Sequence, residues 1–98
     1  MTYDKVKQIG DEFRKKYPSL STDLRFGRAL NIIRRDGVRP MGDGKYLVIG
    51  DKDKCYLVTV GKSPTCMVDG TDEPCPDHAK GNICKHRRAV GMVMLTMK

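Results

Sequence analysis

Apolar side chains recur every three or four residues along the first third of the chain. Residues 3–17 predict an amphipathic helix whose apolar face carries Tyr3, Val6, Ile9, Phe13 and Tyr17. Pro18 ends this helix, because a proline disfavours helical backbone at the residue before it. A second helix is predicted from Asp23 to Arg35, after a segment rich in N-cap residues, with an apolar face of Phe26, Ala29, Leu30 and Ile33.

The pattern then changes to short runs of β-branched and aromatic residues. Residues 45–49 and 55–60 are predicted strands, and the polar, glycine-containing segment 50–54 between them predicts a β-hairpin. Residues 65–68 could pair as a third short strand. The middle of the chain is therefore predicted to form a small antiparallel sheet.

The remainder is predicted to be a loop over residues 69–82, followed by a helix that begins near Cys84 and runs close to the end. This order predicts an α+β fold with two N-terminal helices, a β-hairpin, room for a third short strand, a loop and a C-terminal helix. A chain of 98 residues is one domain, 1–98. Its helical part is 1–37, and the hairpin, loop and closing helix occupy 38–98.

The loop and the start of the last helix concentrate the metal-binding residue types. The run from Cys66 to His86 holds three of the four cysteines and both histidines of the chain. Interleaved in this way, thiols and imidazoles indicate metal ligands rather than disulfides in a reducing compartment. Soft sulfur and imidazole donors suit tetrahedral zinc, so one structural Zn²⁺ is expected. In a domain this small, the metal would add usefully to stability.

Three ligands follow from their positions. Cys84 and His86 form a Cys-x-His pair where the last helix begins, so both donors can reach one ion before regular helical geometry sets in. Cys75 lies between two prolines on a stiff turn and is the third ligand. The fourth is either Cys66 or His78. The remaining cysteine lies within a predicted strand and is expected to be a small core residue.

These residues resemble the SWIM zinc finger, a family found in chromatin-remodelling ATPases, Mutator-type transposases and some recombination factors. Its pattern is a β-hairpin, Cys-x-Cys, a variable loop and Cys-x-His at the start of a helix. The similar segments here are the lead-in 28–38, the hairpin 46–60, Cys75-Pro76-Asp77-His78 and the closing segment 84–90. The resemblance thus covers roughly residues 28–98 and leaves the first helix outside it.

The chain departs from the family pattern at one position. Glu73 stands where the family has its first cysteine, so the resemblance implies an insertion that widens the pair to Cys66 and Cys75. The position of His78 is often aromatic in the family, which implies a structural role for that side chain. Cys66 is therefore favoured over His78 as the fourth ligand.

The motifs of zinc enzymes are absent. A catalytic zinc site keeps one position open and places a carboxylate nearby as general base. The deaminase pattern of Pro-Cys-x-x-Cys is not met after Pro74, and there is no His-Glu-x-x-His. With four ligands available the site is expected to be closed, so we expect neither an enzyme nor a small-molecule substrate.

Charge is distributed unevenly along this basic chain, whose formal net charge is +7. Basic residues predominate between Arg14 and Arg39, whereas the segment from Asp69 to Asp77 is acidic. Such a distribution favours an anionic partner for the basic part. The expected partner is nucleic acid, DNA over RNA, with weak sequence preference and with phosphate contacts from Arg28, Arg34, Arg35, Arg87 and Arg88.

Two alternatives apply to these arginines. The second predicted helix would show a solvated polar face whether or not it binds a ligand. Arg87 and Arg88 stand in the first turn of the last helix, where the helix dipole disfavours cations, so they could instead compensate an anionic zinc–thiolate site.

The last helix suggests a second function. Met92 and Leu95 lie opposite Val90 and Val93, so apolar residues occupy both faces. Such a helix is either buried between other elements or contacts a partner. The alternative function is accordingly a zinc-stabilised protein–protein adaptor or dimerisation module, a role that the resemblance allows in a recombination or replication complex.

Location is expected to be intracellular: the cytoplasm, or the nucleus or a host cell depending on the source. No apolar run approaches the roughly 20 residues that span a bilayer, and residues 1–5 lack the apolar core of a signal peptide. No membrane partner is expected.

Overall fold

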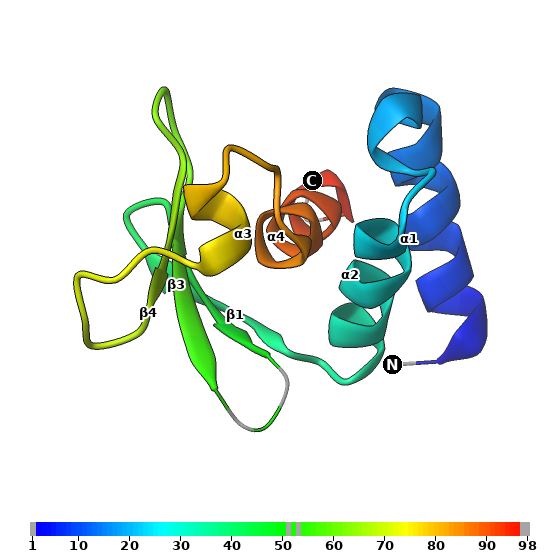
Figure 1. Ribbon diagram of the computed structural model, residues 1–98. Coiled ribbons are helices and arrows are strands. Elements are labelled where there is room, and N and C mark those ends of the chain that lie inside the picture. The colour runs from blue at the N-terminus through cyan, green and yellow to red at the C-terminus, as the bar shows by residue number, and fades with distance from the viewer. Residues whose placement is uncertain (1, 51, 53, 97–98) are drawn as a thin grey trace.

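The computed structural model describes residues 2–50, 52 and 54–96, and it confirms the α+β fold (Figure 1). The N-terminal part forms two α-helices and a short 3₁₀ helix, the middle forms four strands, and the C-terminal part forms two more helices. The elements are α1 (Tyr3–Lys16), η1 (Pro18–Leu20), α2 (Leu24–Arg34), β1 (Val38–Gly42), β2 (Lys45–Ile49), β3 (Cys55–Thr59), β4 (Thr65–Val68), α3 (Pro76–Ala79) and α4 (Lys85–Thr96).

Both N-terminal helices begin at side-chain caps. The backbone N–H of Lys5 donates to Thr2 Oγ1 at 3.3 Å, and the N–H of Phe26 donates to the Asp23 carboxylate at 3.2 Å. Each cap satisfies a backbone donor that has no partner within its helix. The predicted ends of both helices lie within one residue of the observed ends.

The sheet is an antiparallel meander in the order β1-β2-β3-β4. The predicted hairpin is β2 and β3, and the expected third strand is β4. Strand β1 was not predicted, and its Pro40 is unusual in a strand. Pro40 is tolerated because β1 is an edge strand with a bulge between Pro40 and Gly42. Asp43 and Gly44 adopt positive φ angles of 55° and 73° in the β1–β2 turn, so this Asp-Gly pair was the overlooked hairpin signal.

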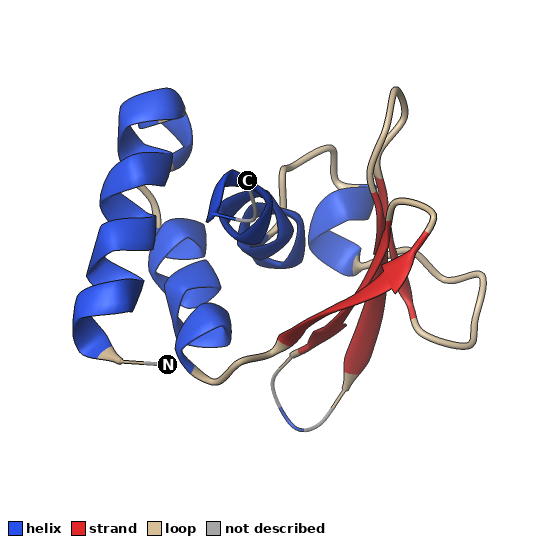
Figure 2. Cartoon of the chain, turned by 180° about the vertical axis from the view of Figure 1, so that it is seen from behind, coloured by secondary structure: helices blue, strands red, loops and turns tan. Residues whose placement is uncertain are grey.

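Helix α4 lies between the sheet and the pair formed by α1 and α2 (Figures 1 and 2). It therefore buries side chains on both sides, which explains why both of its faces are apolar. Met92 is fully buried, and Leu95 is half-buried against the core. The prediction that Met92 belongs to a partner-binding surface is therefore wrong. Among the described residues, no helix has the length and apolar character needed to cross a bilayer.

Candidate metal centre

Four buried side chains converge where β4, α3 and the start of α4 meet. The sulfur atoms of Cys66, Cys75 and Cys84 and a ring nitrogen of His86 all lie within 4.8 Å of one another. The sulfurs of Cys66 and Cys75 are each 3.6 Å from Nδ1 of His86. These four residues are the four favoured from the sequence, and the group could bind one metal ion.

The spacing of the donors fits a small tetrahedral ion. With metal–sulfur bonds of about 2.3 Å and a metal–nitrogen bond of about 2.0 Å, tetrahedral geometry separates sulfur from nitrogen by about 3.5 Å. The two measured sulfur–nitrogen distances are both 3.6 Å. Both distances are therefore compatible with a tetrahedral ion, and all four donor atoms lie within 4.8 Å of one another.

A backbone turn brings Cys66 and Cys75 together although eight residues separate them. The N–H of Cys75 donates to the carbonyl of Cys66 at 2.8 Å, and the N–H of Val68 donates to the carbonyl of Glu73 at 2.8 Å. An isolated bridge between Met67 and Pro74 extends this pairing. The segment after β4 thus folds back along the strand, and residues 69–74 form an exposed loop that leaves the two sulfurs adjacent.

Cys84 immediately precedes α4, and His86 lies in its first turn. The pKa of Cys84 is lowered to about 4, chiefly because Cys66 donates a hydrogen bond to its sulfur; His86 and the backbone N–H of Arg87 add to the effect, and burial opposes it. The pKa of Cys66 is raised by its hydrogen bond with Cys84 and by burial. A cation bound here would replace the protons of these thiols, because cysteine binds a metal as the thiolate.

The imidazole of His86 is oriented by an aromatic ring. Tyr56 on β3 stacks on it with the ring centroids 3.8 Å apart and an angle of 22° between the planes. Nε2 is buried and has no hydrogen-bond partner among the described residues. A metal-bound histidine usually donates this second N–H to an acceptor that fixes the ring. Here the stacking contact with Tyr56 fixes it.

Gly50 makes room for this stack. A Cβ atom at Gly50 would lie 2.9 Å from Cε1 of Tyr56, 3.1 Å from the carbonyl oxygen of Lys54 and 3.3 Å from Nε2 of His86. Any larger residue would displace either the backbone or the two stacked rings. The glycine at the end of β2 is thus part of the support for His86.

The alternative ligand His78 and the fourth cysteine, Cys55, lie outside the cluster. His78 is half-buried in α3, and its Nδ1 has no hydrogen-bond partner among the described residues. It does not belong to the group of four donors. Cys55 is half-buried at the start of β3 and is likewise outside that group.

The five arginines predicted to contact phosphate differ in exposure. Arg28, Arg34 and Arg35 are exposed on α2, and Arg87 is half-buried. Arg88 is only 5% exposed. The prediction of a nucleic-acid contact is therefore wrong for Arg88.

Arg88 instead joins α4 to the N-terminal helices. Its guanidinium donates to the carbonyl of Ile83 at 2.6 Å, to the carbonyl of Leu20 at 3.1 Å and to the carboxylate of Asp23. Asp23 is also the N-cap of α2, so one carboxylate holds both the cap and the buried arginine. The arginine in the first turn of α4 is thus explained by this packing contact.

A second ion pair, which was not predicted from the sequence, joins α2 to the metal-binding segment. Arg25 donates to both oxygens of Asp77 at 2.6 and 2.7 Å, and the Asn82 amide donates to the same carboxylate at 2.9 Å. These contacts lower the pKa of Asp77 to about 2, the hydrogen bond from Arg25 being the largest cause. The two partners are 52 residues apart, so no local pattern could have indicated the pair.

Comparisons with family models, with curated proteins and with solved structures find no match for the chain. The resemblance to the SWIM zinc finger accordingly stays a prediction. The candidate site is defined by its own geometry.

Proposed function

We propose that the protein is a small zinc-binding module that binds nucleic acid through the basic face of α2. The observation that carries this proposal is the placement of α2 beside the candidate metal centre. Arg28, Arg34 and Arg35 are exposed on that helix, and the Arg25–Asp77 pair ties it to the segment that follows Cys75. Arg28 lies on α2 and Arg35 at its C-cap on the same side of the helix, and exposed arginines placed in this way suit the oxygens of a phosphate backbone.

The donor set and its order along the chain support zinc as the metal. Three sulfurs and one imidazole are typical of structural zinc sites. A Cys-x-His pair at the start of α4 and an earlier cysteine pair beside a hairpin also agree with the order in the SWIM family. DNA is favoured over RNA by that resemblance alone.

We infer a structural rather than a catalytic metal. All four donors come from the protein and are buried, so a tetrahedral ion would have no position for water or substrate. A closed site of this kind contributes folding energy and holds neighbouring elements in place.

Elemental analysis tests the metal assignment. We expect one zinc per chain, its loss in Cys66→Ser and its retention in His78→Ala. His78→Ala is the matched control, because that imidazole is nearby but outside the cluster. Loss of zinc in His78→Ala together with retention in Cys66→Ser would contradict the assignment of Cys66.

Binding of labelled DNA over a salt series tests the function. Affinity for duplex DNA should fall by roughly 0.9 log units per contacted phosphate for each log unit of salt. Arg28→Glu/Arg35→Glu should weaken binding at least tenfold. Lys5→Glu/Lys7→Glu makes the same charge change on exposed positions of α1 and should have a much smaller effect. Absence of binding by the zinc-loaded protein at low salt would overturn the proposal.

A further inference from the structure

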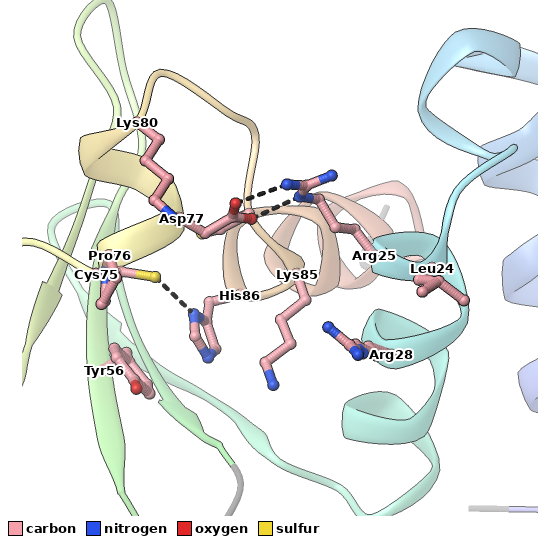
Figure 3. A pocket seen from close by; sticks show the side chains of 11 residues that line it. Leu24, Arg25, Arg28, Tyr56, Cys75, Pro76, Asp77, Lys80, Lys85 and His86 are labelled. Carbon is pink, nitrogen blue, oxygen red and sulfur yellow. Dashed lines mark hydrogen bonds and ion pairs between the residues drawn. The ribbon is translucent and has the colours of Figure 1, made fainter.

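A cleft of about 450 Å³ opens beside the candidate metal centre (Figure 3). One wall is the first half of α2, with Arg25 and Arg28. The opposite wall comes from α3 and the residue after it, Lys80, while Lys85 of α4 and Tyr56 of β3 complete the lining. Segments far apart in the sequence thus contribute to one hollow.

Cationic side chains outnumber the carboxylate in this cleft, which is also lined by three of the candidate metal donors, Cys75, Cys84 and His86. Of the residues that line it, two arginines and two lysines are cationic, and Asp77 is the one carboxylate. Both oxygens of Asp77 accept hydrogen bonds from Arg25. Arg28 and Lys80 are exposed and Lys85 is half-buried, so their charges face a space that a ligand can enter. The chemistry of this lining selects an oxyanion such as a phosphate.

The size of the cleft restricts how nucleic acid can occupy it. A hollow of this volume matches the range of about 300–1,000 Å³ that holds small ligands, which corresponds to one or two nucleotides. A duplex, whose major groove alone is about 12 Å wide, would meet only the rim. A single strand is narrow enough to enter, and the Tyr56 ring, which is stacked on His86, forms part of the wall that it would meet.

We propose that this cleft binds a phosphate and its nucleotide from single-stranded nucleic acid, with Arg28, Lys80 and Lys85 as the cations that hold the phosphate. The inference rests on the proposed function and names the form of nucleic acid that the module recognises. A competing role for the lysines is to balance the charge of the nearby thiolates.

The test compares two double variants with the same charge change. Lys80→Gln/Lys85→Gln alters the cleft, whereas Lys5→Gln/Lys7→Gln alters exposed positions of α1 outside it. Fluorescence anisotropy with labelled oligo-dT and with a duplex of equal length gives the affinities, and elemental analysis gives the zinc content. We expect the cleft variant to lose at least tenfold in affinity for oligo-dT, to lose less than threefold for the duplex, and to keep its zinc. Its salt slope on oligo-dT should fall by about 0.7 for each lost phosphate contact.

The outcomes separate this inference from the proposed function. If the unaltered protein binds oligo-dT and the cleft variant binds it equally well, the inference fails and the proposed function stands. Loss of zinc in the cleft variant alone would show that the lysines balance the thiolates, and would also overturn the inference. If the unaltered protein binds neither oligonucleotide, the proposed function fails and the inference fails with it.

Discussion

In the layer formed by α1 and α2 the buried side chains are large and apolar, whereas beside the sheet they include three cysteines and a histidine. Ile9, Phe13, Ile32 and Ile33 are each at most 2% exposed on the helical side. On the sheet side, the buried valines of β2 and β3 are accompanied by the four donors of the candidate metal centre. The helical side is therefore stabilised by apolar burial, and the sheet side depends on satisfying buried polar groups.

Helix α4 packs against both the helical side and the sheet side, so the two sides are not independent of each other. Its apolar residues pack against both layers, and Arg88 at its start bonds to Asp23 on the helical side. The Arg25–Asp77 pair makes a second connection. The comparison teaches that a small domain can obtain stability from two sources and connect them through a few long-range ion pairs.

Removing the metal is the strongest test of this comparison. A structural zinc contributes on the order of 10 kcal/mol in small zinc domains, about as much as the total stability of a typical domain. We expect chelation, or Cys84→Ser, to abolish hydrogen-exchange protection in β2, β3 and β4 first, with α1 and α2 retaining part of theirs. Cys55→Ser is the control. This cysteine lies outside the donor cluster, so the variant protein should still bind the metal. Simultaneous loss of protection in every element would show instead that the two sides unfold as one unit.

Phe13→Ala tests the helical side. The ring is 2% exposed and packs against Phe26 with a centroid distance of 6.1 Å, so its removal leaves a cavity. We expect a loss of about 4 kcal/mol in the free energy of unfolding, measured by urea denaturation of the zinc-loaded protein. Zinc content should be unchanged in the folded protein.

Tyr3→Ala is the matched control for that change. Its ring lies on the same helix but is 78% exposed, so the loss should stay below about 0.5 kcal/mol. Equal effects of the two substitutions would contradict the view that buried apolar area stabilises this side.

The parts of the fold that depend on local patterns could be predicted from the sequence. The two N-terminal helices and the central hairpin follow from periodicity and turn residues, and each lies close to its predicted bounds. The candidate ligands follow from residue type and spacing, because few side chains can serve as soft donors. By contrast, α3 (Pro76–Ala79) was expected to be loop, because a helix of one turn shows no period.

Long-range contacts determined the rest. Arg88 was assigned to the surface because arginine is usually exposed, but its carboxylate partner is 65 residues away in the sequence. Met92 was assigned to an interface. A second apolar face on a helix means either burial between other elements or contact with a partner, and only the position of α4 in the fold distinguishes the two. The support of His86 by Tyr56 could not be predicted either, since it depends on the register of β3 beside α4.

Arg88→Met tests the connection between the layers. The substitution keeps much of the buried aliphatic volume but leaves two backbone carbonyls and Asp23 without their donor. We expect a loss of about 2 kcal/mol in the free energy of unfolding, because two backbone carbonyls lose a donor, whereas Asp23 is 36% exposed and still accepts from the N–H of Phe26. Arg87→Met, at a half-buried position, should cost much less. A small effect at both positions would show that apolar packing of α4 suffices to join the layers.

Asp77→Asn tests the second connection, where the expected effect is smallest. The carboxyl has a pKa of about 2 rather than 3.8, so its ionised form stabilises the folded state above about pH 4, and that contribution disappears as pH falls toward 2. Because the side chain is 30% exposed, we expect the variant to be less stable by about 1 kcal/mol at pH 7. The stability difference between the two proteins should shrink below pH 4. If both bind zinc and release it in acid, that release affects both and cancels in the difference. Arg25→Gln should add little to Asp77→Asn if the two side chains act as one pair. Full additivity of the two substitutions would show that each residue stabilises the fold through other contacts.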